Sequence, residues 1–258
     1  LSYSLSGTDT SAISINSTSG MLVFNTAPDY EIKTSYSVIV TVSDGSESAS
    51  QTLNITILDV DDVAPVFTSD ATFSAAENQT SIGTVTATDT DTDDSLIVFS
   101  VSGSELLITS GGILTFANAP DYETKTSYSA TVTASDGTNS ATQDITVNIT
   151  DANDSAPEFT SSATFSATEN QTSIGTVTAT DGDGDTIGFS LSGTDASSMS
   201  INSSSGVLMF NSAPDYETKS SYSATVTASD GTNSTSQTIT VTIVDVDDVA
   251  PAFTSNAS

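Results

Sequence analysis

The sequence predicts an all-β protein made of tandem β-sandwich domains, and three observations lead to this prediction. A carboxylate-rich segment that ends in Pro-x-Phe recurs three times, beginning at Asp59, Asp151 and Asp245, so the chain repeats about every 93 residues, a length that suits a sandwich of seven strands. Between the copies, short segments alternate apolar and polar residues, as half-buried strands do. Their apolar residues are largely Val, Ile, Tyr and Phe, which favour strands over helices.

The repeat divides the chain into four parts. Residues 1–63 resemble the later two thirds of a repeat, since residues 5–9 match residues 191–195 in the same order. We therefore expect a window cut from a longer array. Its parts are a first repeat at 1–63 without its opening strands, complete second and third repeats at 64–155 and 156–249, and the start of a further repeat at 250–258. The alternative is that a neighbouring molecule completes the open sheet of the first repeat.

Each complete repeat reads as seven short strands separated by turn residues. In the second repeat the expected strands are 67–73, 82–88, 97–101, 106–108, 113–116, 128–134 and 145–149. Gly111-Gly112 is a turn pair between the fourth and fifth of them. The third repeat follows the same plan nearly residue for residue, with Ser and Thr on the solvent face.

Composition excludes several classes of function. The formal charge is −30, from 33 acidic and 3 basic residues, so the surface repels nucleic acid and anionic lipid. Because the chain contains no His and no Cys, acyl-transfer triads, disulfides and typical zinc or copper sites are excluded. No apolar run is long enough for direct membrane insertion. Carboxylate pairs occur in every repeat and suit metal ligands better than catalysts, so we expect no enzyme.

The acidic residues fall in register from repeat to repeat. Each complete repeat carries a lone Glu, an Asp-x-Asp pair, an Asp-Tyr-Glu triplet, a Ser-Asp-Gly triplet and the acidic segment that we call the joint, and the first repeat carries the last three. A merely solvated acidic surface would scatter its charges, so this register indicates a site. Calcium takes roughly six to eight oxygen ligands, with backbone carbonyls among them, and is the natural occupant. The alternative for the Asp-x-Asp pairs is a polar turn between strands.

These motifs resemble those of the cadherin-type repeat family, and the resemblance covers nearly the whole chain. Residues 151–159 fit the joint motif Asp-x-Asn-Asp-x-x-Pro-x-Phe at every fixed position. Asp61 and Asp247 stand in place of the Asn in the other two joints. The resemblance implies Greek-key, immunoglobulin-like sandwiches with about three calcium ions clamped at each complete joint.

The resemblance also implies which residues bind calcium. At the first joint they are Asp29, Glu31, Asp59, Asp61, Asp62, Asp89, Asp91 and Asp136. At the second joint they are Glu77, Asp121, Glu123, Asp151, Asn153, Asp154, Asp181, Asp183 and Asp230. The last joint offers Glu169, Asp215, Glu217, Asp245, Asp247 and Asp248.

The expected function is structural: a calcium-rigidified extracellular stalk or filament segment of a cell-surface adhesion protein. Its partners would be neighbouring repeats of the same chain and identical chains in a filament. The simple repeats, rich in Ser, Thr and Asp, resemble those of giant bacterial adhesins. The chain has no Trp, which argues against the tryptophan-strand exchange of animal cadherins.

One alternative is an adhesion module that binds carbohydrate or protein through surface loops. It predicts an aromatic patch in one repeat that its siblings lack, and the sequence shows none. A second open question concerns the lysines. Lys33, Lys125 and Lys219 each follow an Asp-Tyr-Glu triplet by two positions. We expect them to temper local charge, and a covalent side-chain crosslink is the alternative.

Overall fold

The structure is a computed structural model that describes residues 1–251, so most of the further repeat predicted at 250–258 lies outside the described residues. Within them, all regular structure is β-strand except two three-residue 3-10 helices, η1 (Asp94–Leu96) and η2 (Ala196–Ser198). Residue contacts group the chain into two units, Leu1–Pro120 with Ser127–Ile149, and Asp121–Thr126 with Thr150–Ser258. Over the described range, no helix has the length and apolar character needed to span a membrane.

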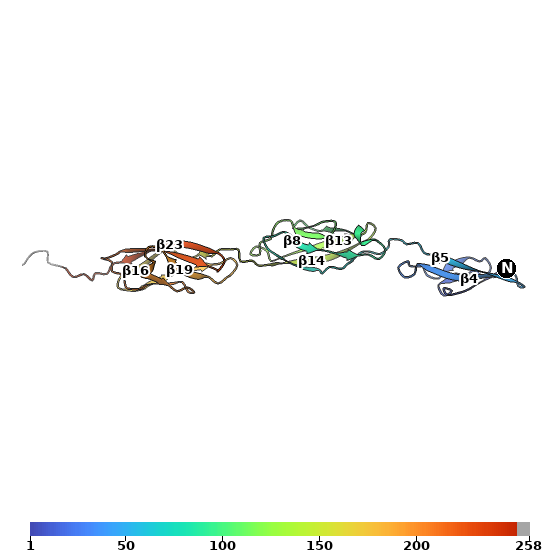
Figure 1. The fold of residues 1–258 in the computed structure, drawn as a ribbon, viewed down its shortest axis with the longest axis horizontal. Coiled ribbons are helices and arrows are strands. Elements are labelled where there is room, and N and C mark those ends of the chain that lie inside the picture. Colours follow the sequence, from blue (N-terminus) through green and yellow to red (C-terminus); the bar gives the residue numbers. More distant parts are fainter. Residues whose placement is uncertain (252–258) are drawn as a thin grey trace, which may run out of the picture. The chain divides into compact units, whose positions relative to one another are not determined.

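The first repeat forms two small antiparallel sheets (Figure 1). One sheet has the order β1-β4-β5 and the other pairs β2 with β3. The strands are β1 (Ser2–Ser6), β2 (Ile13–Ile15), β3 (Leu22–Phe24), β4 (Ser35–Ser43) and β5 (Ser48–Thr56). Strand β5 lies at a sheet edge, and its apolar residues Leu53 and Ile55 are only half-buried.

The second repeat is a two-layered sandwich. Its larger sheet has the order β10-β13-β14-β7, the facing sheet has the order β11-β12-β8, and β6 pairs with β9. The strands are β6 (Val66–Phe67), β7 (Thr72–Ala76), β8 (Ser81–Thr84), β9 (Ala87–Thr88), β10 (Val98–Val101), β11 (Leu106–Ile108), β12 (Ile113–Phe116), β13 (Ser127–Ser135) and β14 (Ser140–Thr150).

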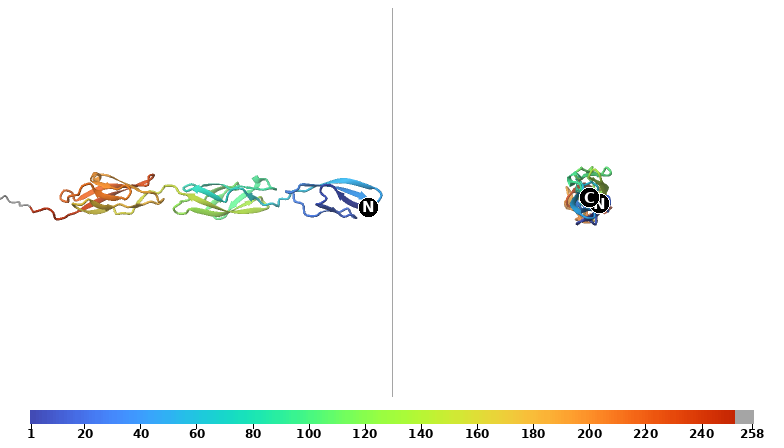
Figure 2. Two further views of the ribbon diagram at one scale, coloured as in Figure 1. Left: turned by 90° about the horizontal axis from the view of Figure 1, so that it is seen from below. Right: turned by 90° about the vertical axis from the view of Figure 1, so that its right-hand side faces the viewer.

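The third repeat has the same topology, and Figure 2 shows its strands in the orange and red part of the ribbon. Its sheets have the orders β16-β23-β22-β19, β17-β21-β20 and β15-β18. The strands are β15 (Glu158–Phe159), β16 (Thr164–Thr168), β17 (Ser173–Thr176), β18 (Ala179–Thr180), β19 (Gly188–Ser192), β20 (Met199–Ile201), β21 (Val207–Phe210), β22 (Ser221–Ser229) and β23 (Ser234–Val244).

The opening strand of each complete repeat is divided, where the sequence predicts one continuous strand. In the third repeat, β15 pairs antiparallel with β18 and β16 pairs parallel with β23, so the chain crosses from one sheet to the other between them. The predicted strand 82–88 is divided in the same way, into β8 and β9, where the Val85 N–H leaves the ladder and donates to the Gly112 carbonyl at 2.8 Å. With each divided strand counted once, residues 64–155 hold the seven strands predicted.

The core lies between the two layers and follows the alternation of the long strands. In β23, Ile239, Val241 and Ile243 are at most 2% exposed, while the residues between them face solvent. The tyrosine that opens β22 packs on this core, since the rings of Tyr222 and Phe210 meet edge to face with centroids 4.9 Å apart. This contact favours a core role for the tyrosine over a ligand-stacking role.

Gly206 lies in the turn between β20 and β21, where its backbone is close to that of Val177. Its φ is +67°, and an added Cβ would lie 2.1 Å from the carbonyl oxygen of Val177, whose own N–H donates to the Gly206 carbonyl. Gly206→Ala should therefore lower the free energy of unfolding well beyond the roughly 1 kcal/mol that left-handed backbone alone costs alanine. Chemical denaturation of the whole chain measures this.

The matched control is Gly231→Ala, at φ +101° with open space around the added Cβ. This variant should lower the free energy of unfolding only by the amount that a left-handed backbone costs alanine. Equal losses for the two variants would show that the Val177 contact is unimportant.

Candidate metal centre

At the first joint, backbone and side chains hold an Asp-x-Asp pair in a fixed orientation. The N–H groups of Asp62 and Val63 both donate to Asp91 Oδ2 at 2.8 Å. The Asp91 N–H in turn donates to Asp89 Oδ1 at 3.0 Å. The joint therefore presents the remaining carboxylate oxygens of the pair on one side of a tight turn.

The second joint repeats this arrangement with its own residues. The N–H groups of Asp154 and Ser155 donate to Asp183 Oδ2 at 3.0 and 2.9 Å. The Asp183 N–H donates to Asp181 Oδ1 at 3.1 Å. The same local sequence thus produces the same hydrogen-bonded turn in both complete repeats.

Six carboxylate oxygens at the joints have less than 1 Å² of exposed surface and no hydrogen-bond partner. They are Asp89 Oδ2, Asp91 Oδ1, Asp136 Oδ2, Asp181 Oδ2, Asp183 Oδ1 and Asp230 Oδ2, three equivalent atoms in each of two repeats. Over residues 1–251, the only other side-chain atoms of this kind are the amide oxygens of Gln143 and Gln237. Burying an anionic oxygen without a partner is costly unless a cation neutralises it. These oxygens therefore fit a hard cation.

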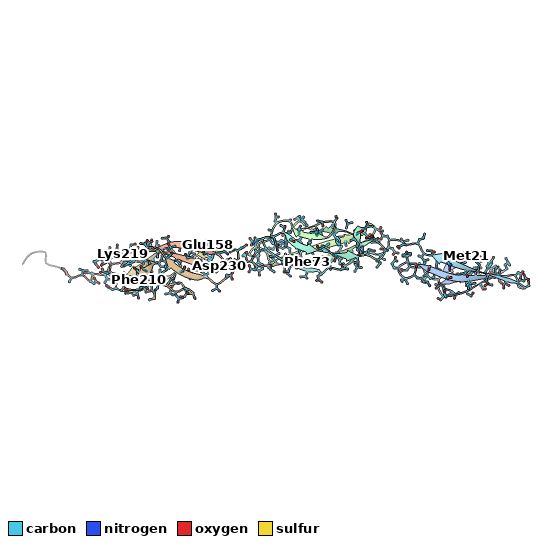
Figure 3. All side chains as sticks on the ribbon, viewed as in Figure 1. Met21, Phe73, Glu158, Phe210, Lys219 and Asp230 are labelled. Atoms are coloured by element: carbon cyan, nitrogen blue, oxygen red, sulfur yellow. The ribbon has the colours of Figure 1, made fainter. Side chains whose placement is uncertain are left out.

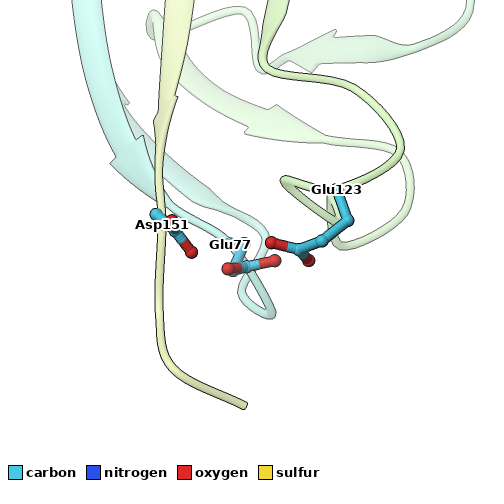
Figure 4. A group of neighbouring side chains, drawn as sticks. All are labelled: Glu77, Glu123 and Asp151. Atoms are coloured by element: carbon cyan, nitrogen blue, oxygen red, sulfur yellow. The ribbon is translucent and has the colours of Figure 1, made fainter. Parts of the chain in front are cut away.

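Acidic side chains also lie close to one another in small groups. Four groups of three offer carboxylate oxygens within 4.8 Å of one another: Glu77, Glu123 and Asp151 (Figure 4); Glu123, Asp154 and Asp183; Asp181, Asp183 and Asp185; and Glu169, Asp215 and Glu217. Fourteen different residues take part in at least one of these groups or in the set of six oxygens, and all but Asp185 are predicted ligands.

Glu169 shows how the lone Glu of a repeat is fixed. It is 2% exposed and follows β16 directly. Its Oε2 accepts the Tyr216 N–H at 2.9 Å and its Oε1 accepts the Val246 N–H at 2.6 Å. The buried carboxylate therefore ties the Asp-Tyr-Glu turn to the segment that leaves β23.

The remaining predicted ligands are placed more loosely. The N–H of Glu31 lowers the pKa of its own carboxyl, but desolvation and the charges of the nearby Asp59, Asp29 and Asp62 outweigh it, so the pKa is raised. In the same way, burial and then the charges of Glu169 and Asp245 raise the pKa of Glu217, although its own N–H lowers it. Three further residues complete the set: Asp121 accepts from Thr124, Asp248 accepts from Asn170, and Asp247 joins no acidic group within residues 1–251.

Hydrogen bonds and burial shift the pKa values of Asp89, Asp91 and Asp230. Hydrogen bonding with Asp89 and the N–H groups of the joint lower the pKa of Asp91, while the neighbouring Asp91 raises the pKa of Asp89. Burial raises the pKa of Asp230, but the N–H groups of Asn233 and Thr232 outweigh it and the net shift is downward.

Two asparagines that the sequence reasoning missed hold the joints in place. Asn139 Nδ2 donates to both the backbone carbonyl and Oδ1 of Asp61 at 3.2 Å, and Asn233 Nδ2 donates to Asn153 Oδ1 at 2.9 Å. Each stands three residues after the Asp of Ser-Asp-Gly. The sequence signal for these asparagines is that Asn stands at this position in both complete repeats, whereas the first repeat has Glu47 there.

Two of the lysines neutralise acids outside the predicted ligand sets. Lys33 pairs with Asp9, and Lys219 (Figure 3) pairs with Asp195 at 2.5 Å. Lys219 Nζ also lies 4.7 Å from the ring centre of Tyr222, a cation–π distance. The lysine therefore anchors the end of the Asp-Tyr-Glu turn and leaves the charge of the candidate ligands uncompensated.

Comparison with known proteins agrees with this architecture. The family model described as "Cadherin domain" matches residues 162–244, and the one described as "Bacterial Ig domain" matches residues 61–150. The chain is 34% identical over 257 residues to the protocadherin-like wing polarity protein stan of Drosophila melanogaster, covering 88% of this chain and 7% of that protein. It is also 34% identical over 263 residues to the human cadherin EGF LAG seven-pass G-type receptor 1, covering 93% of this chain and 9% of the receptor.

Solved structures give the same result. Mouse cadherin-23 EC22-24 matches with a TM-score of 0.78 and 25% identity over 95% of this chain and 86% of that one. The protocadherin gammaB7 EC3-6 cis-dimer structure matches with a TM-score of 0.78 and 27% identity over 96% of this chain and 67% of that one. The predicted class of tandem all-β sandwiches is thereby confirmed.

The Lys219–Asp195 pair predicts a pH dependence. The hydrogen bond from Lys219 and the Ser223 N–H lower the pKa of Asp195 below its usual 3.8. A lowered folded-state pKa stabilises the fold above pH of about 3.8, and this contribution is lost as the pH falls through the lowered pKa. Because the Lys219 side chain is 42% exposed, the contribution should be less than about 1 kcal/mol.

Asp195→Asn should therefore lower the thermal unfolding midpoint near neutral pH, and the gap from the parent chain should close on acidification. Melting curves of both proteins between pH 7 and pH 2 measure the gap. A gap that stays constant over this range would contradict the assignment.

Proposed function

This chain consists of tandem cadherin-type domains, and we propose that calcium bound at each joint makes it a rigid extracellular stalk in a cell-surface adhesion protein. Cadherin-type repeats are extracellular, non-enzymatic adhesion domains, which confirms the predicted localisation and the prediction that the chain is no enzyme. The family binds calcium between its domains, and acidic groups lie near the joints of this chain.

The observation that carries the proposal is the set of six buried carboxylate oxygens without partners, three in each of two repeats. Calcium suits them because it accepts carboxylate and carbonyl oxygens in flexible geometry, whereas magnesium prefers to keep several waters. The ligands proposed are the full sets predicted at the three joints, with about three ions at each complete joint. Asn139 and Asn233 are added as supports that orient the joint residue they bind.

The chain's own residues would convert binding into stiffness. Backbone N–H groups of the joint already fix one oxygen of Asp91 and of Asp183. Bound calcium would supply the positive charge that the opposing oxygens lack. Without it, carboxylates a few ångströms apart repel one another, and each joint gains conformational freedom.

A bacterial source and assembly of identical chains into filaments are finer parts of the same proposal. The support is the match of residues 61–150 to a family described as a bacterial Ig domain and the near-identity of successive repeats, which suits a spacer that needs length more than a unique surface. No feature of the described residues favours the alternative of a carbohydrate-binding or protein-binding loop module.

The proposal predicts that calcium protects the joints specifically. With millimolar calcium, proteinase K should cut the whole chain slowly within residues 59–65 and 151–157, and chelation should expose both. Each ion that binds only the folded joint adds about 1.4 kcal/mol at a calcium concentration ten times its Kd. The thermal midpoint should therefore rise with calcium.

Magnesium chloride and sodium chloride at equal ionic strength are the controls, and both should protect far less. Mass spectrometry of the fragments identifies which joint is cut. Equal protection by sodium chloride would show that charge screening is sufficient and would refute the calcium site.

A further inference from the structure

The two complete joints differ at one central position. The first joint has Asp61 and the second has Asn153 at the equivalent place. Both residues receive the same hydrogen bond, from Asn139 and Asn233 respectively. The second joint therefore has the same local geometry with one carboxylate fewer.

An acid of the third repeat lies against that position. Asn153 Nδ2 donates to Asp185 Oδ2 at 2.5 Å. Asp185 belongs to the acidic group with Asp181 and Asp183, whose oxygens lie within 4.8 Å of one another. Two oxygens of that group, Asp181 Oδ2 and Asp183 Oδ1, are buried without partners, so the group suits a cation.

The equivalent acid of the second repeat has a different contact. Asp93 Oδ1 accepts the Ser95 N–H at 2.9 Å and caps η1. The third repeat has no 3-10 helix at this place, and Gly184, at φ +78°, stands where the second repeat has Thr92. Glycine readily adopts this left-handed conformation, and the conformation lets the turn bring Asp185 to the joint.

From these contacts we infer that Asp185 is an additional calcium-site residue of the second joint, where it supplies the carboxylate that Asn153 lacks. The first joint carries this carboxylate in the joint segment, at Asp61, and the second joint carries it in the Asp-x-Asp turn, at Asp185. An acid in contact with an acidic joint residue would set two carboxylates against each other, whereas Asp185 meets the amide donor of Asn153. This inference rests on the proposed function, because it adds a residue to the same calcium site.

The test compares Asp185→Asn with Asp93→Asn in the whole chain. Calcium is titrated under limited proteolysis, and fragment masses report the half-protecting concentration for residues 151–157 and for residues 59–65 separately. Asp185→Asn should raise this concentration about tenfold at the second joint and leave the first joint unchanged, since calcium affinity follows ligand charge. Asp93→Asn should change neither by more than about twofold.

The exchange variant Asn153→Asp with Asp185→Asn moves the charge back to the joint segment. It should restore the protection of the second joint to within about twofold of the parent. Asn153→Asp alone supplies a readout without metal: in chelator its thermal midpoint should fall below that of the parent, because two carboxylates then face each other, and Asp185→Asn should reverse the fall.

The inference is overturned if Asp185→Asn leaves protection of the second joint unchanged, or if the exchange variant is no better protected than Asp185→Asn alone. Either result would leave the calcium stalk intact, provided that the parent chain is still protected by calcium. Failure of calcium to protect the parent chain would instead refute the proposed function itself.

Discussion

Repulsion between the carboxylates at the joints is the constraint that governs the order of each joint. The sequence places 33 acidic residues against 3 basic ones, and the fold then buries part of that charge at recurrent positions. Backbone N–H groups satisfy one oxygen of each aspartate in the Asp-x-Asp turns, but the opposing oxygens remain without partners. Neutralisation must therefore come from outside the chain, which links the order of the joints to the available cations.

The sandwich serves mainly to bring these acids together from distant parts of the sequence. In the third repeat, the divided opening strand places Glu169 at the end of β16, where it contacts both the Asp-Tyr-Glu turn and the segment after β23. The lysine that follows the triplet is fixed on Asp195 and Tyr222. The candidate ligands thus sit on turns anchored to a packed core, which limits how far they can separate when no cation is bound.

Much of this arrangement could be predicted because the relevant patterns are local. Alternating residues predict the long strands, and the recurrence of Asp-x-Asp and Asp-Tyr-Glu at fixed spacing predicts which acids belong to the candidate site. Division of the opening strand could not be predicted in this way, because it depends on pairing of β15 and β16 with strands far along the sequence. The contacts of Asn139, Asn233 and Asp185 with the joints are of the same long-range kind, and Asp185 also depends on a left-handed glycine turn.

A crystal structure of the whole chain grown with calcium, with anomalous difference maps, tests the central claim most directly. The account predicts anomalous peaks at both complete joints, about 2.3–2.6 Å from the buried oxygens of the Asp-x-Asp turns, including Asp89 Oδ2 and Asp181 Oδ2. Maps at millimolar calcium in which these oxygens contact only water or protein donors, with no peak at either joint, would contradict it.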